Sequence, residues 1–446
     1  MGRDALVDGF LGRVKEKSPG QTEFHQAVAH VARDVITIEK ASTEFTAAKV
    51  LERLSEPDRI IGFRVVWQDD AGDVQVNRGW RVQYSNAIGP YKGGLRFHPS
   101  VSPSVLKFLG FEQVFKNALT GLPLGGGKGG ADFDPTGRSE AEIMRFCQSF
   151  MRQLAPEIGP DRDIPAGDIN VGTREIGWLF AAYKAYAQQF SGALTGKGQS
   201  FGGSAIRAEA TGYGLIYFVE AMLAEQDRDL AGKRVAVSGK GNVATHAAEK
   251  AVVRGAKVIT LSDTSGTLCA PDGLTTDAID WVRTRKAAGE DISNPPRNLG
   301  VRFSEGATPW EQEVDIALPC ATQNELDGTM AKCLVANGTS IVAEGANMPL
   351  TDVARTVISD AGLLHAPGKA SNAGGVAVSG LEMSQNNHRR YSSAEDVDAD
   401  LRQIMRDIHA RCLHEGRDGN RVDYGRGANI AAFRKVADAV TAMGAI

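Results

Sequence analysis

The chain has 446 residues, 42% of them hydrophobic, with 50 basic and 54 acidic side chains and a formal net charge of −4. This balance argues against a general nucleic-acid binder and against a polybasic membrane surface, and no apolar run approaches the length of a membrane span. One hydrophobic core rarely organises so long a chain, so two domains are expected. The N-terminus lacks a signal-peptide core, and a cytoplasmic protein is the simplest interpretation.

Cysteine and histidine spacing gives no sign of a crosslink or a metal centre. The five cysteines are scattered without a Cys-x-x-Cys pair, and the eight histidines form no His-x-x-x-His pair. We therefore expect reduced cysteines and no metal site.

The beginning of the chain changes from helical to strand periodicity. From Thr22 to about Leu54 apolar residues recur at helical spacing, which predicts a helical opening segment available for subunit contacts. From Ile60 apolar residues alternate with period two, and a turn over 69–72 predicts a β-hairpin. A further strand is expected over 80–84.

The next part of the chain contains three polar residues that are candidates for ligand binding. Lys92 stands among the glycines of 89–97. A helix is predicted from Pro103 to Leu119, and Gln113 and Lys116, three residues apart on it, share one face. Taken alone, each of the helical residues is also typical of an exposed position on a surface helix.

The segment 121–130 carries a single charged side chain, Lys128, among six glycines. It is not a phosphate-binding loop, because Leu122 and Gly129 occupy the places that require Gly and Ser or Thr. The alternative is a flexible turn with a solvated lysine. A short strand is expected only after it, over 131–133.

A second chemical candidate is Asp168, which lies in the apolar, glycine-containing loop 164–172 after a predicted helix over 140–154. An aspartate before a helix is most often an N-cap. We expect Thr173 to cap the next helix, over 175–189, which leaves Asp168 available for chemistry.

The strongest fold signal follows a Gly/Ser/Thr-rich segment over 191–204, where we place the domain boundary. The pattern over 233–263 predicts a strand, a Gly-x-Gly-x-x-Ala turn, a helix and a second strand. In such a turn Gly239 permits the tight bend, Gly241 lets a pyrophosphate approach the helix N-terminus, and Ala244 keeps helix and strand close. This context predicts a dinucleotide-binding domain.

The residues after the second strand bear on cofactor choice. Asp263 at its end would favour NAD through the ribose hydroxyls, whereas the hydroxyls of Ser262, Thr264 and Ser265 could serve a 2′-phosphate. A following helix carries three cations, which are equally compatible with solvated helix charges: Arg283, Arg285 and Lys286.

Two later apolar runs, over 314–319 and 341–345, are predicted strands of the same sheet, and the second leads into a polar loop with Asn347. Such loops at the carboxyl ends of parallel strands are where these sheets bind ligands. A small-residue segment over 368–384 follows, and two helices are expected over 394–415 and 429–443.

Together these motifs resemble the hexameric glutamate dehydrogenases, and especially their NADP-dependent branch. The resemblance extends over essentially the whole chain. It rests on blocks at 89–97, 115–118, 121–130, 165–168, 207–214, 239–244, 344–349 and 369–382.

The resemblance implies an α/β fold of two domains. Residues 1–200 would form a substrate-binding and oligomerisation domain with a mixed sheet, to which a C-terminal helix at about 425–446 returns. Residues 201–424 would form a Rossmann-like NADP-binding domain. It also implies a homohexamer, with no nucleic-acid or membrane partner.

The family reaction is the reversible oxidative deamination of L-glutamate to 2-oxoglutarate and ammonium. By resemblance, Lys92 and Ser379 bind the side-chain carboxylate of the substrate. Gln113 and Lys116, helped by the backbone of Gly167, bind its α-carboxylate. A dicarboxylate needs two cationic anchors, which lysines supply.

By the same resemblance, Lys128 is the catalytic lysine and Asp168 its proton-transfer partner. Burial, together with the nearby Lys92 and Lys116, predicts a lowered pKa for Lys128. The residues expected to hold the NADP cofactor are Thr211, Gly239, Gly241, Asn242, Ser262, Lys286 and Asn347.

Three alternatives remain at this stage. The first is a glutamate dehydrogenase that prefers NAD. The second is a branched-chain or aromatic amino-acid dehydrogenase of the same superfamily, which would lack a cationic anchor at the position of Lys92. The third is a non-catalytic nucleotide-binding homologue, which would be expected to lose Lys128 or Asp168.

Overall fold

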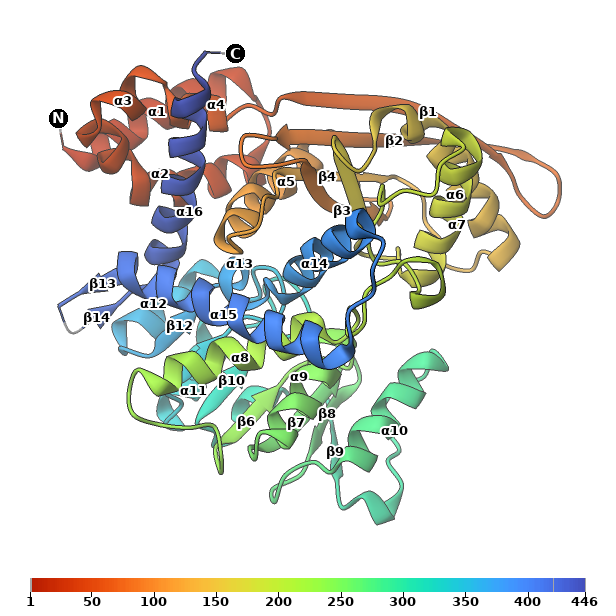
Figure 1. The fold of residues 1–446 in the computed structure, drawn as a ribbon. Helices are drawn as coiled ribbons and strands as arrows, with labels where there is room; N and C mark the ends of the chain where they lie inside the picture. Colours follow the sequence, from red (N-terminus) through yellow and green to blue (C-terminus); the bar gives the residue numbers. More distant parts are fainter. Residues whose placement is uncertain (1, 420, 446) are drawn as a thin grey trace. The chain divides into compact units, whose positions relative to one another are not determined.

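The computed structural model describes residues 2–419 and 421–445 and shows the chain divided into two compact units (Figure 1). The first unit comprises Met1–Ala205, Val378–Val397 and Asn429–Ile446. The second comprises Ile206–Ala377 and Asp398–Ala428. In the described residues, no helix has the length and apolarity needed to cross a bilayer.

The chain opens with four helices: α1 (Arg3–Lys17), α2 (Thr22–Ala41), α3 (Thr43–Ala47) and α4 (Val50–Leu54). The predicted helical segment from residue 22 is thus confirmed, although it is interrupted twice. Ser42 caps α3 by accepting a hydrogen bond from the backbone of Phe45, and Lys49 adopts a left-handed φ of 50° before α4. Helix α1 was not predicted.

The first unit holds a mixed five-stranded sheet in the order β1-β2-β4-β3-β5. Its strands are β1 (Arg59–Gln68), β2 (Val74–Ser85), β3 (Tyr91–Phe97), β4 (Gly126–Ala131) and β5 (Asp163–Gly167). The predicted hairpin is β1–β2, and the strand expected over 80–84 is the second half of β2. Strand β4 is antiparallel to β2 and parallel to β3, so it is hydrogen-bonded to a neighbouring strand along both edges.

Helices cover both faces of this sheet: α5 (Pro103–Leu119) on one side, and α6 (Glu140–Leu154) with α7 (Thr173–Ala187) on the other. Because side chains alternate along a strand, Gly79 of β2 approaches Phe150 of α6 while Tyr84 approaches Gly110 of α5. The predicted bounds of α5 and α6 are confirmed.

The start of α7 differs from the prediction. Thr173 is its first residue, and Gly172 is the N-cap. The backbone N–H of Gly172 donates to the side chain of Glu175 at 2.8 Å, which replaces the expected threonine cap.

The second unit holds a seven-stranded sheet in the order β12-β11-β10-β6-β7-β8-β9. Its strands are β6 (Arg234–Val237), β7 (Lys257–Asp263), β8 (Gly266–Cys269), β9 (Arg302–Glu305), β10 (Ile316–Leu318), β11 (Ile341–Ala343) and β12 (Leu364–Ala366). The strands from β12 to β7 are parallel, whereas β8 and β9 are antiparallel to their neighbours. The two-domain α/β class is confirmed, and the later strands belong to the sheet as predicted.

Its helices are α8 (Ala210–Ala224), α9 (Asn242–Val253), α10 (Thr276–Ala287), α11 (Gly328–Ala336), α12 (Asp352–Asp360), α13 (Gly368–Ser371) and most of α15 (Ala394–Gly416). A two-stranded ribbon, β13 (Arg417–Asp418) with β14 (Arg421–Val422), follows α15. Helices α14 (Gly374–His388) and α16 (Tyr424–Met443) begin in the second unit and end in the first. Most of the small-residue segment over 368–384 lies in α13 and α14.

Candidate active site

Lys128 lies in β4, a central strand, and not in a flexible turn. Every residue of β4 is buried, and Lys128 itself is 4% exposed. The neighbouring glycines allow this packing: a Cβ at Gly93 would lie 1.7 Å from the carbonyl oxygen of Gly127, and one at Gly126 would lie 2.3 Å from Val114 of α5. The glycine-rich composition thus reflects close contact of two strands and a helix.

The amine of Lys128 meets the carboxylate of Asp168, which follows β5. Lys128 Nζ lies 3.0 Å from Asp168 Oδ2. The same oxygen accepts a hydrogen bond of 2.8 Å from Nε of Arg96 on β3. Asp168 does not cap α7, whose N-cap is Gly172. The close approach depends on Gly94, where a Cβ would lie 2.8 Å from that of Asp168.

This arrangement shifts both pKa values. Burial lowers the pKa of Lys128, and the charges of Arg96 and Arg81 lower it further, while Asp168 opposes the shift. Burial acts to raise the pKa of Asp168, but Lys128 and Arg96 outweigh it and lower that pKa to about 2. The predicted lowering for Lys128 is confirmed in direction. The two arginines were not predicted from the sequence.

A buried ion pair supports the site from β2. Arg81 and Asp163 are both fully buried, and Arg81 Nε donates to Asp163 Oδ2 at 2.9 Å. The guanidinium also donates to the carbonyl oxygen of Gly93 at 3.0 Å, next to Lys92 on β3. An arginine within an alternating strand pattern is the only sequence signal for this pair, and it is weak.

The predicted carboxylate-binding residues lie on β3 and α5. Lys92 is 1% exposed, and its carbonyl oxygen accepts a hydrogen bond of 3.1 Å from the side chain of Asn117. Asn117 also accepts a bond of 2.7 Å from Gln113, so one amide links Lys92 to Gln113. Lys116 is half-buried one turn further along α5, and Gly167 ends β5 beside Leu95 of β3.

Ser379 reaches the first unit through α14. It is 1% exposed, and a Cβ on the next residue, Gly380, would lie 2.6 Å from Leu122 in the segment before β4. The helix is held by Glu382, whose carboxylate meets Lys197 Nζ at 2.7 Å with both side chains buried. The first unit therefore contains all seven predicted catalytic and substrate residues: Lys92, Gln113, Lys116, Lys128, Gly167, Asp168 and Ser379.

The second unit contains all seven predicted cofactor residues. Gly239 has a φ of 89°, and its N–H donates to Ser262 Oγ at 2.9 Å, which ties the turn to β7. Gly241 is the N-cap of α9 and gives no side-chain cap, and a Cβ there would meet no atom within 4 Å. An open, uncapped helix N-terminus fits the phosphates of a dinucleotide.

Thr211 and Asn347 lie around the start of the α13–α14 segment. Thr211 Oγ1 would be 2.5 Å from a Cβ placed at Gly375. Asn347 accepts a hydrogen bond of 3.0 Å from Asn372 Nδ2. The Oδ1 atom of Asn372 is buried and has no hydrogen-bond partner within the described part of the chain, and the sequence analysis did not single this residue out.

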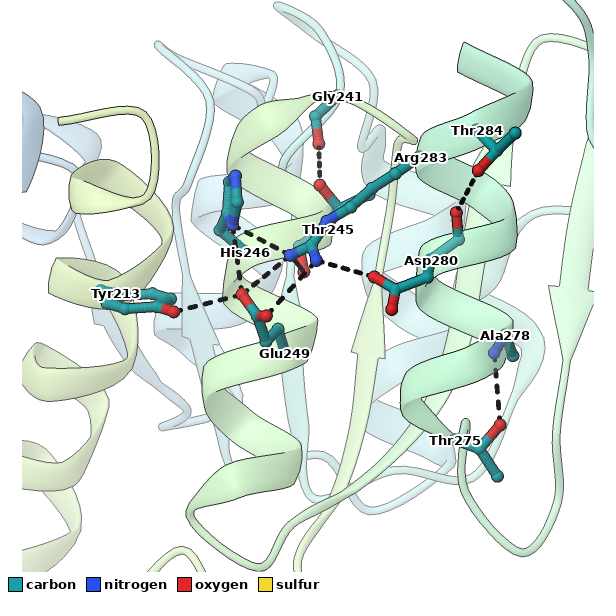
Figure 2. A network of polar contacts seen from close by, with 10 residues as sticks. All are labelled: Tyr213, Gly241, Thr245, His246, Glu249, Thr275, Ala278, Asp280, Arg283 and Thr284. Carbon is teal, nitrogen blue, oxygen red and sulfur yellow. Dashed lines mark hydrogen bonds and ion pairs between the residues drawn. The ribbon is translucent and has the colours of Figure 1, made fainter. Parts of the chain in front are cut away.

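The three cations of α10 have different surroundings. Arg283 is turned toward α9, where it meets Glu249 at 2.8 Å, and it also pairs with Asp280 at 3.0 Å (Figure 2). Arg285 pairs with Glu290. Only Lys286 lies at the glycine turn, because its Nζ donates to Asn242 Oδ1 at 2.7 Å.

A dinucleotide-type sheet in one unit and a buried Lys–Asp pair in the other fit a nicotinamide-dependent amino-acid dehydrogenase. Residues 202–444 match the model of the Glutamate/Leucine/Phenylalanine/Valine dehydrogenases, and residues 57–185 match the dimerisation domain of the same family. The chain belongs to this family, as the resemblance predicted.

Similar proteins are glutamate dehydrogenases of differing cofactor preference. The chain is 54% identical over 447 residues to an NADP-specific glutamate dehydrogenase of Salmonella typhimurium, covering 100% of both chains. It is 53% identical over 438 residues to an NAD-specific enzyme of Porphyromonas gingivalis, covering 98% of both. A crystal structure of Plasmodium falciparum glutamate dehydrogenase superposes with a TM-score of 0.97 at 44% identity, covering 100% of this chain and 96% of that one.

Proposed function

We propose that the protein is an NADP-dependent glutamate dehydrogenase, which interconverts L-glutamate with 2-oxoglutarate and ammonium. The similarity to NADP-specific glutamate dehydrogenases supports the activity. The observation that carries the proposal is the buried Lys92 of β3 in the same unit as the Lys128–Asp168 pair. A buried cation in the unit that holds the reactive lysine suits a substrate with a second carboxylate.

In this proposal the first unit binds the substrate and the second binds NADP. Lys92 and Ser379 bind the distal carboxylate. Gln113, Lys116 and the backbone of Gly167 bind the α-carboxylate. Two fixed anchors at opposite ends of a five-carbon diacid orient its α-carbon and the attached nitrogen, which reduces the entropic cost of reaching the transition state.

Lys128 and Asp168 would handle the protons. The lowered pKa of Lys128 increases the fraction of neutral amine, which can remove a proton from the water that attacks the imine carbon. Asp168, with a pKa of about 2, is ionised at neutral pH and can accept protons from the reacting nitrogen. Arg96 keeps that carboxylate ionised and fixed.

The residues that would hold NADP are Thr211, Gly239, Gly241, Asn242, Ser262, Lys286 and Asn347. When bound, the cofactor supplies or accepts the hydride at the substrate α-carbon. The protein residues bind and orient both reactants.

The dimerisation domain indicates that the protein forms oligomers. We propose that the oligomer is a homohexamer and that the protein acts in the cytoplasm. The hexamer predicts a particle of about six times the 47.5 kDa chain mass in light scattering. A dimer as the largest species would contradict it.

Two other functions can be weighed against this proposal. The NAD-specific relative at 53% identity favours testing NAD as the alternative cofactor. A dehydrogenase of apolar amino acids is disfavoured, because the apolar side chain of such a substrate would have to lie against the buried ammonium group of Lys92.

The test is to follow the oxidation of NADPH and of NADH with 2-oxoglutarate and ammonium, omitting each component in turn. We expect NADPH oxidation that requires both substrates. If neither NADPH nor NADH were oxidised, the proposed activity would be wrong. If NADH were oxidised faster than NADPH, the proposed cofactor would be wrong.

A further inference from the structure

The acid at the end of β7 has no acceptor site left for a ligand. Asp263 Oδ1 accepts bonds from both the backbone N–H, at 2.9 Å, and the hydroxyl of Ser265. Its Oδ2 accepts from Lys240 Nζ at 2.7 Å and from the N–H of Ile292 at 3.2 Å. A carboxylate offers about four acceptor positions, and here all four are used. In an NAD-binding sheet this acid accepts bonds from the ribose hydroxyls, which Asp263 can do only by giving up existing partners.

The lysine that pairs with this acid comes from the glycine turn itself. Lys240 stands between Gly239 and Gly241, and its Nζ bonds Asp263 and the carbonyl oxygen of Glu290, each at 2.7 Å. Its side chain keeps 26% of its surface exposed, whereas that of Asp263 keeps 4%. A ligand arriving at the turn therefore reaches the amine more readily than the carboxylate.

A second lysine approaches the same place from α10. Lys286 donates to Asn242 at the start of α9, two residues after Lys240. Burial lowers the pKa of Lys286, and the charge of Lys240 lowers it further, so the two cations repel each other. Among the described residues, Lys286 makes no ion pair with a carboxylate.

The remaining charges near α10 are paired elsewhere. Arg283 is neutralised by Glu249 and Asp280 (Figure 2), and Arg285 by Glu290 and Asp291. Of the two lysines only Lys240 is paired with a carboxylate, Asp263, so an excess of positive charge remains beside an open helix N-terminus. This charge suits a dianionic phosphate.

We propose that Lys240 is a specificity-determining residue for NADP: it occupies Asp263, which would otherwise serve the ribose hydroxyls of NAD, and together with Lys286 it binds the 2′-phosphate. This inference rests on the proposed use of NADP. It assigns the cofactor choice to a residue inside the glycine turn, one that the sequence analysis treated only as a variable position.

The test measures binding without turnover, by calorimetry of the full-length protein with 2′,5′-ADP and with 5′-AMP. In Lys240→Met the affinity for 2′,5′-ADP should fall by about tenfold or more, the loss expected for one charge-assisted hydrogen bond. The affinity for 5′-AMP should not fall and should rise if the acceptor that Lys240 frees on Asp263 takes a ribose hydroxyl. The matched control is Lys257→Met, which removes an exposed lysine from the other end of β7 and should alter neither affinity.

A second variant separates a direct role from a structural one. In Asp263→Asn, Lys240 keeps its amine but loses its competing anion, so 2′,5′-ADP should bind more tightly than to the wild type. The inference would be overturned if either variant lost affinity equally for both nucleotides. It would also be overturned if Lys240→Met kept the wild-type affinity for 2′,5′-ADP.

Different results would contradict the proposed function and the role of Lys240. Wild-type protein that binds 2′,5′-ADP through Lys240 but does not aminate 2-oxoglutarate contradicts the activity alone. Wild-type protein that aminates 2-oxoglutarate but binds 5′-AMP as tightly as 2′,5′-ADP contradicts the role of Lys240 alone.

Discussion

Replacement of Arg96 by glutamine should move the pH dependence of the reaction. Arg96 and Lys128 both contact Asp168 Oδ2, at 2.8 and 3.0 Å, so the two cations lie within roughly 6 Å of each other. At an effective dielectric constant of about 20, two unit charges at that distance repel by about 2–3 kcal/mol. Removing Arg96 therefore favours the protonated form of Lys128 and raises its pKa.

The measured quantity is kcat/KM for L-glutamate, in the deamination direction, as a function of pH. Because Lys128 must be neutral to activate water, the acidic limb of the profile should move to higher pH in Arg96→Gln. We expect a displacement of about one pH unit, less than the full repulsion implies, because both groups retain some contact with solvent. At pH values on the acidic limb, kcat/KM of Arg96→Gln should therefore be lower than that of the wild type.

The matched control is Arg78→Gln, which removes an exposed arginine of β2 that pairs with Asp132. Its profile should coincide with that of the wild type. An unchanged acidic limb in Arg96→Gln would refute the assignment of Lys128 as the group that must be deprotonated.

Three further predictions concern the same unit. Lys128→Ala should abolish turnover while NADPH still binds, measured by nucleotide fluorescence. Lys92→Met should raise KM for 2-oxoglutarate about tenfold or more, because a charge-assisted bond to the distal carboxylate is lost. Glu382→Gln leaves the buried Lys197 without its counter-charge and should lower the free energy of unfolding in urea by about 3–5 kcal/mol.

Each of these predictions has a contradicting outcome. Residual activity of Lys128→Ala near that of the wild type would remove the lysine from the chemistry. An unchanged KM in Lys92→Met would leave the distal carboxylate without its proposed anchor. A wild-type urea midpoint for Glu382→Gln would show that the ion pair does not hold α14.

Local signals were enough to predict some parts of the fold. The strand, glycine turn and helix around Gly239 follow from short-range sequence, and the amphipathic spacing of α5 and α6 gave their bounds. The pairing of Lys128 with Asp168 came from the family resemblance, since nothing local joins residues that are 40 positions apart.

Other parts depend on contacts that no local pattern encodes. Strand β4 consists almost entirely of glycine around Lys128, so it has no alternating hydrophobicity, and its state is set by pairing with β2 and β3. Arg96 and Arg81 read as ordinary strand charges, and only the folded sheet brings them to Asp168 and Asp163. The role of Lys240 likewise appears only when β7 places Asp263 beside the glycine turn.

The most direct test of the central claim is the ratio of kcat/KM for L-glutamate to that for L-leucine, measured with NADP in the deamination direction. The account predicts a strong preference for glutamate, because Lys92 and Ser379 hold a second carboxylate that leucine lacks. A leucine value equal to or above that for glutamate would contradict it.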